Sequence, residues 1–156
     1  MTPMVIGIGN PERGDDGAGP FVIACLEQKL PPGITTLCLQ GDPAELLAAW
    51  EQQHQVVIVD ACASGAEPGT VHCFNAATAP VPEGFGAVST HGFGLGAAIE
   101  LGRAMGCLPP ILTVYGIEAA SFEAGAPLSR PVRTAAEVLA QTITRSIGEV
   151  PCTKLV

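Results

Sequence analysis

Short runs of consecutive apolar residues alternate along this chain with stretches in which apolar residues recur every three or four positions. The continuous runs are typical of strands buried on both faces of a sheet, and the helical spacing is typical of amphipathic helices. Strands are predicted at 4–8, 34–39, 56–59, 70–74 and 111–117. Helices are predicted at 21–30, 42–50, 89–105 and 129–147. The run at 56–59 is the clearest central strand, and the short run at 70–74 is a candidate edge strand.

The order of these elements predicts the fold class. Strands that alternate with helices favour a three-layer α/β/α sandwich with a mostly parallel twisted sheet of about five strands. Asp42 and Pro43 stand where a cap and a first helical residue of the second helix are expected. The chain shows no internal repeat and no linker, so we expect one domain at 1–148 and a loose C-terminal tail at 149–156.

Composition removes several classes of partner. Apolar residues make up 47% of the chain and charged residues 14%, which argues against disorder. The net charge of -8, without a Lys/Arg cluster, argues against nucleic acid and anionic membrane surfaces. No apolar run reaches the ~18 residues of a membrane span, and the run at 4–8 is too short for a signal peptide. We expect a cytoplasmic monomer with reduced cysteines, of which Cys25, Cys38 and Cys107 should be buried.

The turn after the first strand resembles a nucleotide-binding turn but lacks its defining residues. Gly7 and Gly9 fit the dinucleotide fingerprint, whereas Glu12 stands in place of the third glycine, and no Gly-Lys-Ser/Thr follows. Asp15 and Asp16 would repel a pyrophosphate bound at this turn. The hypothesis of a small-molecule enzyme that binds a nucleotide at residues 7–10 is therefore weaker than the two hypotheses of a metal-recognising protein that follow.

Acidic residues at this turn suit a cation instead. Asp16 lies at the start of the first helix, Asp60 ends the central strand, and His91 opens the third helix. If the first and central strands are neighbours, both carboxylates reach the same crevice at the carboxyl edge of the sheet. A helix N-terminus disfavours imidazolium, so His91 should be neutral and able to bind metal. These donors suit a divalent ion of the nickel, zinc or iron type.

Each of these residues also has a structural interpretation. One of the two adjacent aspartates could cap the first helix, and we expect Asp15 to do so. Asp60 could serve as a cap or an ion-pair partner, and His91 could be an ordinary polar residue near a helix start.

Three further polar residues invite attention. His72 is predicted on the outward face of its strand. Glu118 could be an acid that supports the site, or an ion-pair partner for Arg130 or Arg133. Cys62 could be a nucleophile or a soft ligand, but the sequence places no activating base or positive charge beside it.

Three segments resemble the nickel–iron hydrogenase maturation endopeptidases: IGIGN with GDDGAG at residues 6–19, VVIVDA at 56–61, and STHGFGL at 89–95. The resemblance spans residues 4–147. STHGFGL and the stretch ILTVYGIE at 111–118 look closest to the branch that serves NAD-linked bidirectional hydrogenases. The family's three metal-contacting residues fall on Asp16, Asp60 and His91, where Asp16 replaces the Glu of some members.

The resemblance implies an endopeptidase that removes the C-terminal extension of the hydrogenase large-subunit precursor once nickel has been inserted. The precursor would supply the nickel, and zinc or cadmium could occupy the same residues in vitro. Whether the metal activates the scissile bond or water, or Asp16 or Asp60 acts as general base, is open. The alternative is a non-enzymatic nickel-loading sensor or chaperone that uses the same three residues.

Overall fold

The computed structural model describes residues 3–82 and 94–147. Its centre is a five-stranded sheet in the order β2-β1-β3-β5-β4. Four of these strands are parallel, and β4 pairs antiparallel with β5 at one edge. The strands are β1 (Met4–Ile8), β2 (Thr35–Leu39), β3 (Gln55–Cys62), β4 (Val71–Asn75) and β5 (Ile111–Glu118). The predicted central strand and the predicted edge strand are both confirmed.

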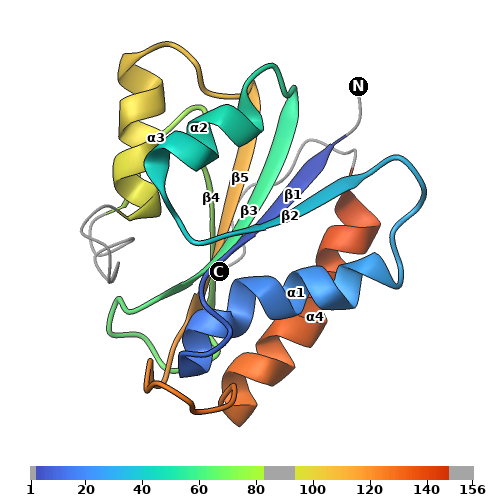
Figure 1. The fold of residues 1–156 in the computed structure, drawn as a ribbon, viewed down its shortest axis with the longest axis vertical. Helices are drawn as coiled ribbons and strands as arrows, with labels where there is room; N and C mark the ends of the chain where they lie inside the picture. The colour runs from blue at the N-terminus through green and yellow to red at the C-terminus, as the bar shows by residue number, and fades with distance from the viewer. Residues whose placement is uncertain (1–2, 83–93, 148–156) are drawn as a thin grey trace.

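Helices cover both faces of the sheet (Figure 1). One face carries α1 and α4, and the other carries α2 and α3, so the predicted three-layer α/β/α sandwich is confirmed. A short 3-10 helix, η1, precedes α1. The helices are η1 (Gly14–Gly17), α1 (Ala18–Glu27), α2 (Pro43–Trp50), α3 (Leu95–Ala104) and α4 (Arg130–Ser146). The predicted tail at 149–156 lies outside the described residues.

Two hydrophobic cores form, one on each face of the sheet. Alternate residues of each strand point to opposite faces, so Val57 and Val59 pack beneath α1 and α4, whereas Val56 and Ile58 pack beneath α2 and α3. The residues on both faces of β3 are buried, which explains why its sequence is one continuous apolar run. Trp50 lies in the second core.

The first helix packs unusually close to the sheet. A Cβ on Gly19 would lie 2.4 Å from the carbonyl oxygen of Ile8, and a Cβ on Gly7 would lie 2.5 Å from the carbonyl oxygen of Gly19. Only glycine at both positions allows the helix and strand backbones to touch. This contact holds the turn between β1 and α1 against the carboxyl edge of the sheet.

Helix starts and ends follow from local chemistry, with one correction. The Asp42 side chain accepts hydrogen bonds from the backbone N–H of Ala44 at 2.8 Å and of Glu45 at 3.4 Å, which confirms the predicted cap of α2. The third helix was expected to open at residues 89–91. The described helix instead begins at Leu95, with Gly94 in extended conformation at its N-cap.

Burial of the cysteines also differs from expectation. Cys38 is exposed because it lies on the edge strand β2. Cys25 on α1 and Cys107 in the loop after α3 are only partly buried. Among the cysteines that the structure describes, the buried one is Cys62. Within residues 3–82 and 94–147, no helix combines the length and apolar character that crossing a membrane requires.

Candidate active site at the carboxyl edge of the sheet

The turn after β1 folds back on itself and holds Asp16. Gly9 has a φ of +138°, and a Cβ there would lie 1.8 Å from the carbonyl oxygen of Asp16. The backbone N–H of Asn10 donates to the Asp16 carboxylate at 2.9 Å. The N–H that could contact a phosphate therefore binds a protein carboxylate instead, which argues further against a nucleotide at residues 7–10.

Asp60 lies on the neighbouring strand, close enough for the charge of Asp16 to act on it, and the edge of the sheet between these two carboxylates is called the crevice below. β1 and β3 are adjacent and parallel, with Gly7 opposite Val59, so Asp60 follows at the carboxyl edge beside the turn. Burial, and then the negative charge of Asp16, raise the pKa of Asp60 to about 8, although a hydrogen bond from the Ala61 backbone lowers it in part. The structure thus brings Asp16 and Asp60 together. Two carboxylates in one half-buried crevice repel each other, and a shared cation would relieve that repulsion.

His91 lies outside the described residues, so the structure does not show where its imidazole points. The described chain resumes at Gly94, immediately before α3, and α3 packs on the same face of the sheet as Ile58. Side chains alternate along β3, so Asp60 belongs to that face too. The prediction that His91 is neutral therefore stays a prediction, because the described helix starts at Leu95 and His91 lies before it, outside the described residues.

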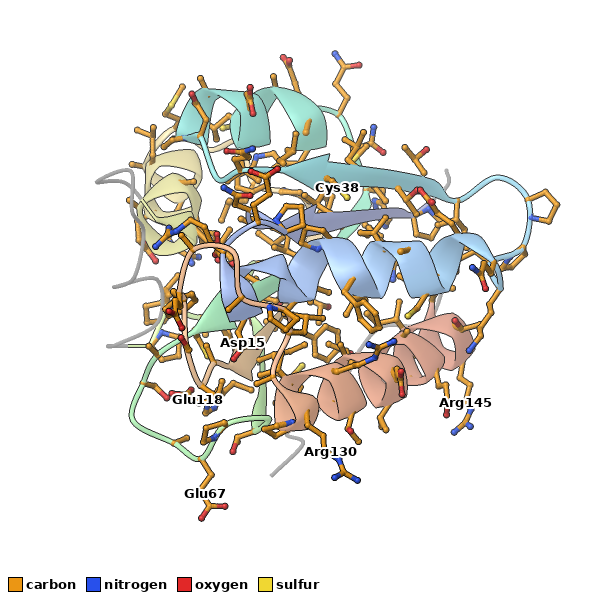
Figure 2. All side chains as sticks on the ribbon, turned by 60° about the horizontal axis from the view of Figure 1, so that its bottom comes forward. Asp15, Cys38, Glu67, Glu118, Arg130 and Arg145 are labelled. Carbon is orange, nitrogen blue, oxygen red and sulfur yellow. The ribbon has the colours of Figure 1, made fainter. Side chains whose placement is uncertain are left out.

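Asp15 does not cap the first helix, contrary to prediction. Gly17 is the N-cap of α1 and offers no side-chain hydrogen bond. Asp15 is buried and points to the loop between β5 and α4 (Figure 2), where it accepts four hydrogen bonds. The donors are Ala120 N at 2.8 Å, Ser121 N at 3.2 Å, Ser129 N at 2.7 Å and Ser129 Oγ at 2.9 Å. Asp15 therefore fixes the loop that leads into the last helix.

Glu118 anchors a second polar cluster at the same edge. Its Oε1 accepts from the backbone N–H groups of Ser64 at 2.6 Å and Gly65 at 3.0 Å. Its Oε2 lies 2.8 Å from Ser64 Oγ, 3.2 Å from Cys62 Sγ and 3.1 Å from His72 Nε2. Burial alone would raise the pKa of Glu118, but hydrogen bonds from Ser64, Cys62 and His72 outweigh it and lower the pKa.

These contacts correct one interpretation and bear on two others. His72 is half-buried against Glu118 rather than turned outward. Glu118 contacts Cys62 and His72 within this cluster, and Arg133 forms its ion pair with Glu137 on α4 instead. Burial, followed by the hydrogen bond and charge of Glu118, raises the pKa of the Cys62 thiol well above its ordinary value, which argues against a nucleophile.

Sequence reasoning missed this cluster because its members come from three strands. A signal was present: His72 and Glu118 have the same parity as core residues Phe74 and Val114 on their strands. Same-face residues on paired strands meet, so a known pairing of β4 with β5 would have predicted the contact.

Comparisons with known proteins agree on one family. The model of the HycI hydrogenase maturation protease family matches residues 40–146. The chain is 28% identical over 145 residues to the hydrogenase expression/formation protein HupD of Rhizobium leguminosarum bv. viciae, covering 91% of this chain and 72% of that protein.

Solved structures show the same likeness. The nickel–iron hydrogenase maturation protease HycI from Thermococcus kodakarensis KOD1 superposes with a TM-score of 0.68 at 27% identity, covering 92% of this chain and 90% of that one. The hydrogenase maturating endopeptidase HybD from E. coli superposes with a TM-score of 0.74 at 25% identity, covering 94% and 91%.

Proposed function

Because the chain belongs to the hydrogenase maturation protease family, we propose that it cleaves the C-terminal extension from a nickel–iron hydrogenase large-subunit precursor after nickel insertion. The nickel belongs to the precursor and is part of the substrate. Asp16, Asp60 and His91 are the proposed contacts, and zinc or cadmium would occupy the same residues in vitro. We expect the protein to act as a cytoplasmic monomer, and the hydrogenase to be of the NAD-linked bidirectional type.

The observation that carries this proposal is the coupled pair of carboxylates. Asp16 is held by the Asn10 backbone N–H, and Asp60 extends from a strand paired on both sides. The Asp16 charge helps to raise the pKa of Asp60, so one negative charge in the crevice disfavours a second. Carboxylate oxygens together with an imidazole suit a divalent ion of the nickel class. Asp16, Asp60 and His91 are therefore donors of the type that the nickel of the precursor requires.

The residues of the chain have distinct proposed tasks. Asp16 and Asp60 would bind the metal of the precursor from the sheet edge, and His91 would complete the contact. A bound metal supplies Lewis acidity to the scissile carbonyl. Because its pKa is raised to about 8, the Asp60 carboxyl group holds a proton near neutral pH. A cation that binds the Asp60 carboxylate should therefore release this proton to solvent. Because the two carboxylates are rigidly placed, they would hold the metal, and with it the scissile bond, in a fixed position.

Cleavage of a nickel-loaded precursor by the purified protein tests this function. We expect the wild-type chain to shorten the loaded precursor and to leave the nickel-free precursor intact. Asp16→Asn, Asp60→Asn and His91→Ala should each slow cleavage at least about 100-fold while the circular dichroism spectrum stays unchanged. Glu137→Gln on the exposed face of α4 is the matched control and should cleave at the wild-type rate.

The outcome separates this function from the alternative of a nickel-loading sensor or chaperone. If the wild-type chain binds the loaded precursor in preference to the nickel-free one but never shortens it, the protease proposal is wrong and the sensor is favoured. Equal cleavage by Asp16→Asn would overturn the assignment of the crevice as the site.

A further inference from the structure

A thiol, an imidazole and a carboxylate converge on the sheet face that also carries Asp60. Cys62 lies at the end of β3, His72 on β4 and Glu118 at the end of β5. Cys62 is opposite Glu118 in the strand pairing, and His72 pairs with Gly116 two residues before Glu118. One donor atom from each residue lies within 4.8 Å of the other two.

The spacing of these atoms is close to that of a tetrahedral metal site. Zinc bonds of about 2.3 Å to sulfur and about 2.0–2.1 Å to nitrogen or oxygen separate neighbouring ligand atoms by about 3.3–3.6 Å. Here Cys62 Sγ and His72 Nε2 lie 3.2 Å and 3.1 Å from the same Glu118 oxygen. An ion therefore needs the Glu118 oxygen to move away from each of the other two atoms by only a few tenths of an ångström, and all three atoms already lie within 4.8 Å of one another.

The surroundings orient the carboxylate for this task. The backbone N–H groups of Ser64 and Gly65 bind Oε1 of Glu118, which turns Oε2 toward the thiol and the imidazole. Such hydrogen bonds to a ligating carboxylate are typical supports of a metal site. The Ser64 hydroxyl lies 3.4 Å from His72 Nε2. The His72 side chain is 33% exposed and provides the route from solvent.

We propose that Cys62, His72 and Glu118 form a second metal site, beside the Asp16–Asp60 crevice, for a divalent transition-metal ion of the zinc class. Sulfur, nitrogen and oxygen donors together favour such borderline ions over Mg²⁺ or Ca²⁺. On binding, the thiol proton leaves to solvent as the sulfur–metal bond forms, and neutral His72 binds through Nε2 with its proton on Nδ1. This site does not depend on the proposed protease function.

Cobalt(II) titration tests the site, because a sulfur-to-cobalt charge-transfer band arises only when a thiolate binds the ion. The full-length chain carries Asp16→Asn and Asp60→Asn, which disable the neighbouring crevice, and a phosphine keeps the thiols reduced. We expect the band to appear and to disappear when zinc is added. Cys62→Ser in this background should abolish the band. Cys73→Ser is the matched control and should retain it, since Cys73 packs on the opposite face, against the α1–α4 core.

A second variant keeps the test decisive if Cys62→Ser fails to fold. His72→Gln changes a half-exposed residue and should weaken cobalt binding at least about tenfold, with an unchanged circular dichroism spectrum. A missing band, a band that persists in Cys62→Ser, or full cobalt affinity in His72→Gln would overturn the proposal. This experiment does not measure precursor cleavage, so a failure of the proposed protease function would leave the cobalt result unaffected.

Discussion

At the scale of single residues, the adjacent aspartates of the first turn have separate environments. Asp15 is buried and saturated by donors from the loop before α4, whereas Asp16 is half-buried and shares its crevice with Asp60. The 3-10 geometry of η1 separates the two side chains, because successive residues of a tight helix point in different directions. Asp15 is structural, and Asp16 remains available to a ligand.

The coupling between Asp16 and Asp60 predicts a pH dependence of stability in the metal-free protein. Burial, and then the Asp16 charge, raise the pKa of Asp60 from 3.8 to about 8. Between these values the folded chain holds a proton that the unfolded chain has lost, so the free energy of unfolding falls as pH rises. The fall starts near pH 4, ends above pH 8 and amounts to a few kcal/mol, on the order of one for each pH unit.

Urea denaturation at about pH 5 and about pH 8.5 checks this prediction. Asp60→Asn should remove most of the loss that the wild type shows between the two conditions. Glu67→Gln is the control, because Glu67 points into solvent (Figure 2), and it should keep the wild-type loss. An Asp60→Asn chain that loses as much stability as the wild type would show that Asp60 titrates normally.

At the scale of elements, close packing of α1 on β1 positions the site. The helix begins directly after η1, so its distance from the sheet sets the distance of Asp16 from β3. The three atoms nearest to a Cβ on Gly19 would all be backbone atoms, namely Ile8 O, Ile8 N at 2.6 Å and Val59 O at 2.7 Å. Backbone atoms in a sheet cannot move aside singly, so the helix itself would have to shift.

Gly19→Ala should therefore lower the free energy of unfolding by about 1–3 kcal/mol, although alanine is the better helix former. Gly102→Ala in α3 is the matched control. Its Cβ would meet the ends of flexible side chains, Leu108 Cδ2 at 2.9 Å and Leu47 Cδ2 at 3.2 Å. We expect a smaller loss at Gly102, measured by chemical denaturation. Equal losses at both positions would contradict the proposed backbone contact.

At the scale of the whole molecule, the first turn and the last helix are locked together. The Asp15 carboxylate joins residues more than one hundred positions away, and backbone bonds run beside it from Gly14 N to Ala126 O at 3.1 Å and from Gly125 N to Glu12 O at 2.7 Å. α1 and α4 pack against each other on the same face of the sheet (Figure 1). The ends of the described fold thus support each other and hold the turn that carries Asp16.

Asp15→Ala should lower the free energy of unfolding by about 2–4 kcal/mol, because it leaves several N–H groups without their charged acceptor. Asp42→Ala removes an exposed helix cap with two hydrogen bonds and should cost about 1 kcal/mol. Thermal or urea denaturation of both variants compares the two. A loss at Asp15 no larger than that at Asp42 would show that the long-range tie contributes little.

Local information predicted the elements well. Continuous apolar strands, the Asp42–Pro43 start of α2 and the amphipathic pattern of α4 are properties of neighbouring residues, and all three appear in the structure. The start of α3 was misplaced, because Ser89 and Thr90 are good capping residues and Gly94 carries no capping side chain. The role of Asp15 was missed because its partners lie in another part of the chain.

The amino-acid sequence alone determined the layered fold and the candidate residues Asp16 and Asp60, since period and residue type act over a few positions. The tertiary structure decided what Asp15 binds, which acid meets Cys62 and His72, and how far Asp60 resists ionisation. The physical reason is distance through space: burial, charge coupling and shared hydrogen bonds depend on strand register and helix packing.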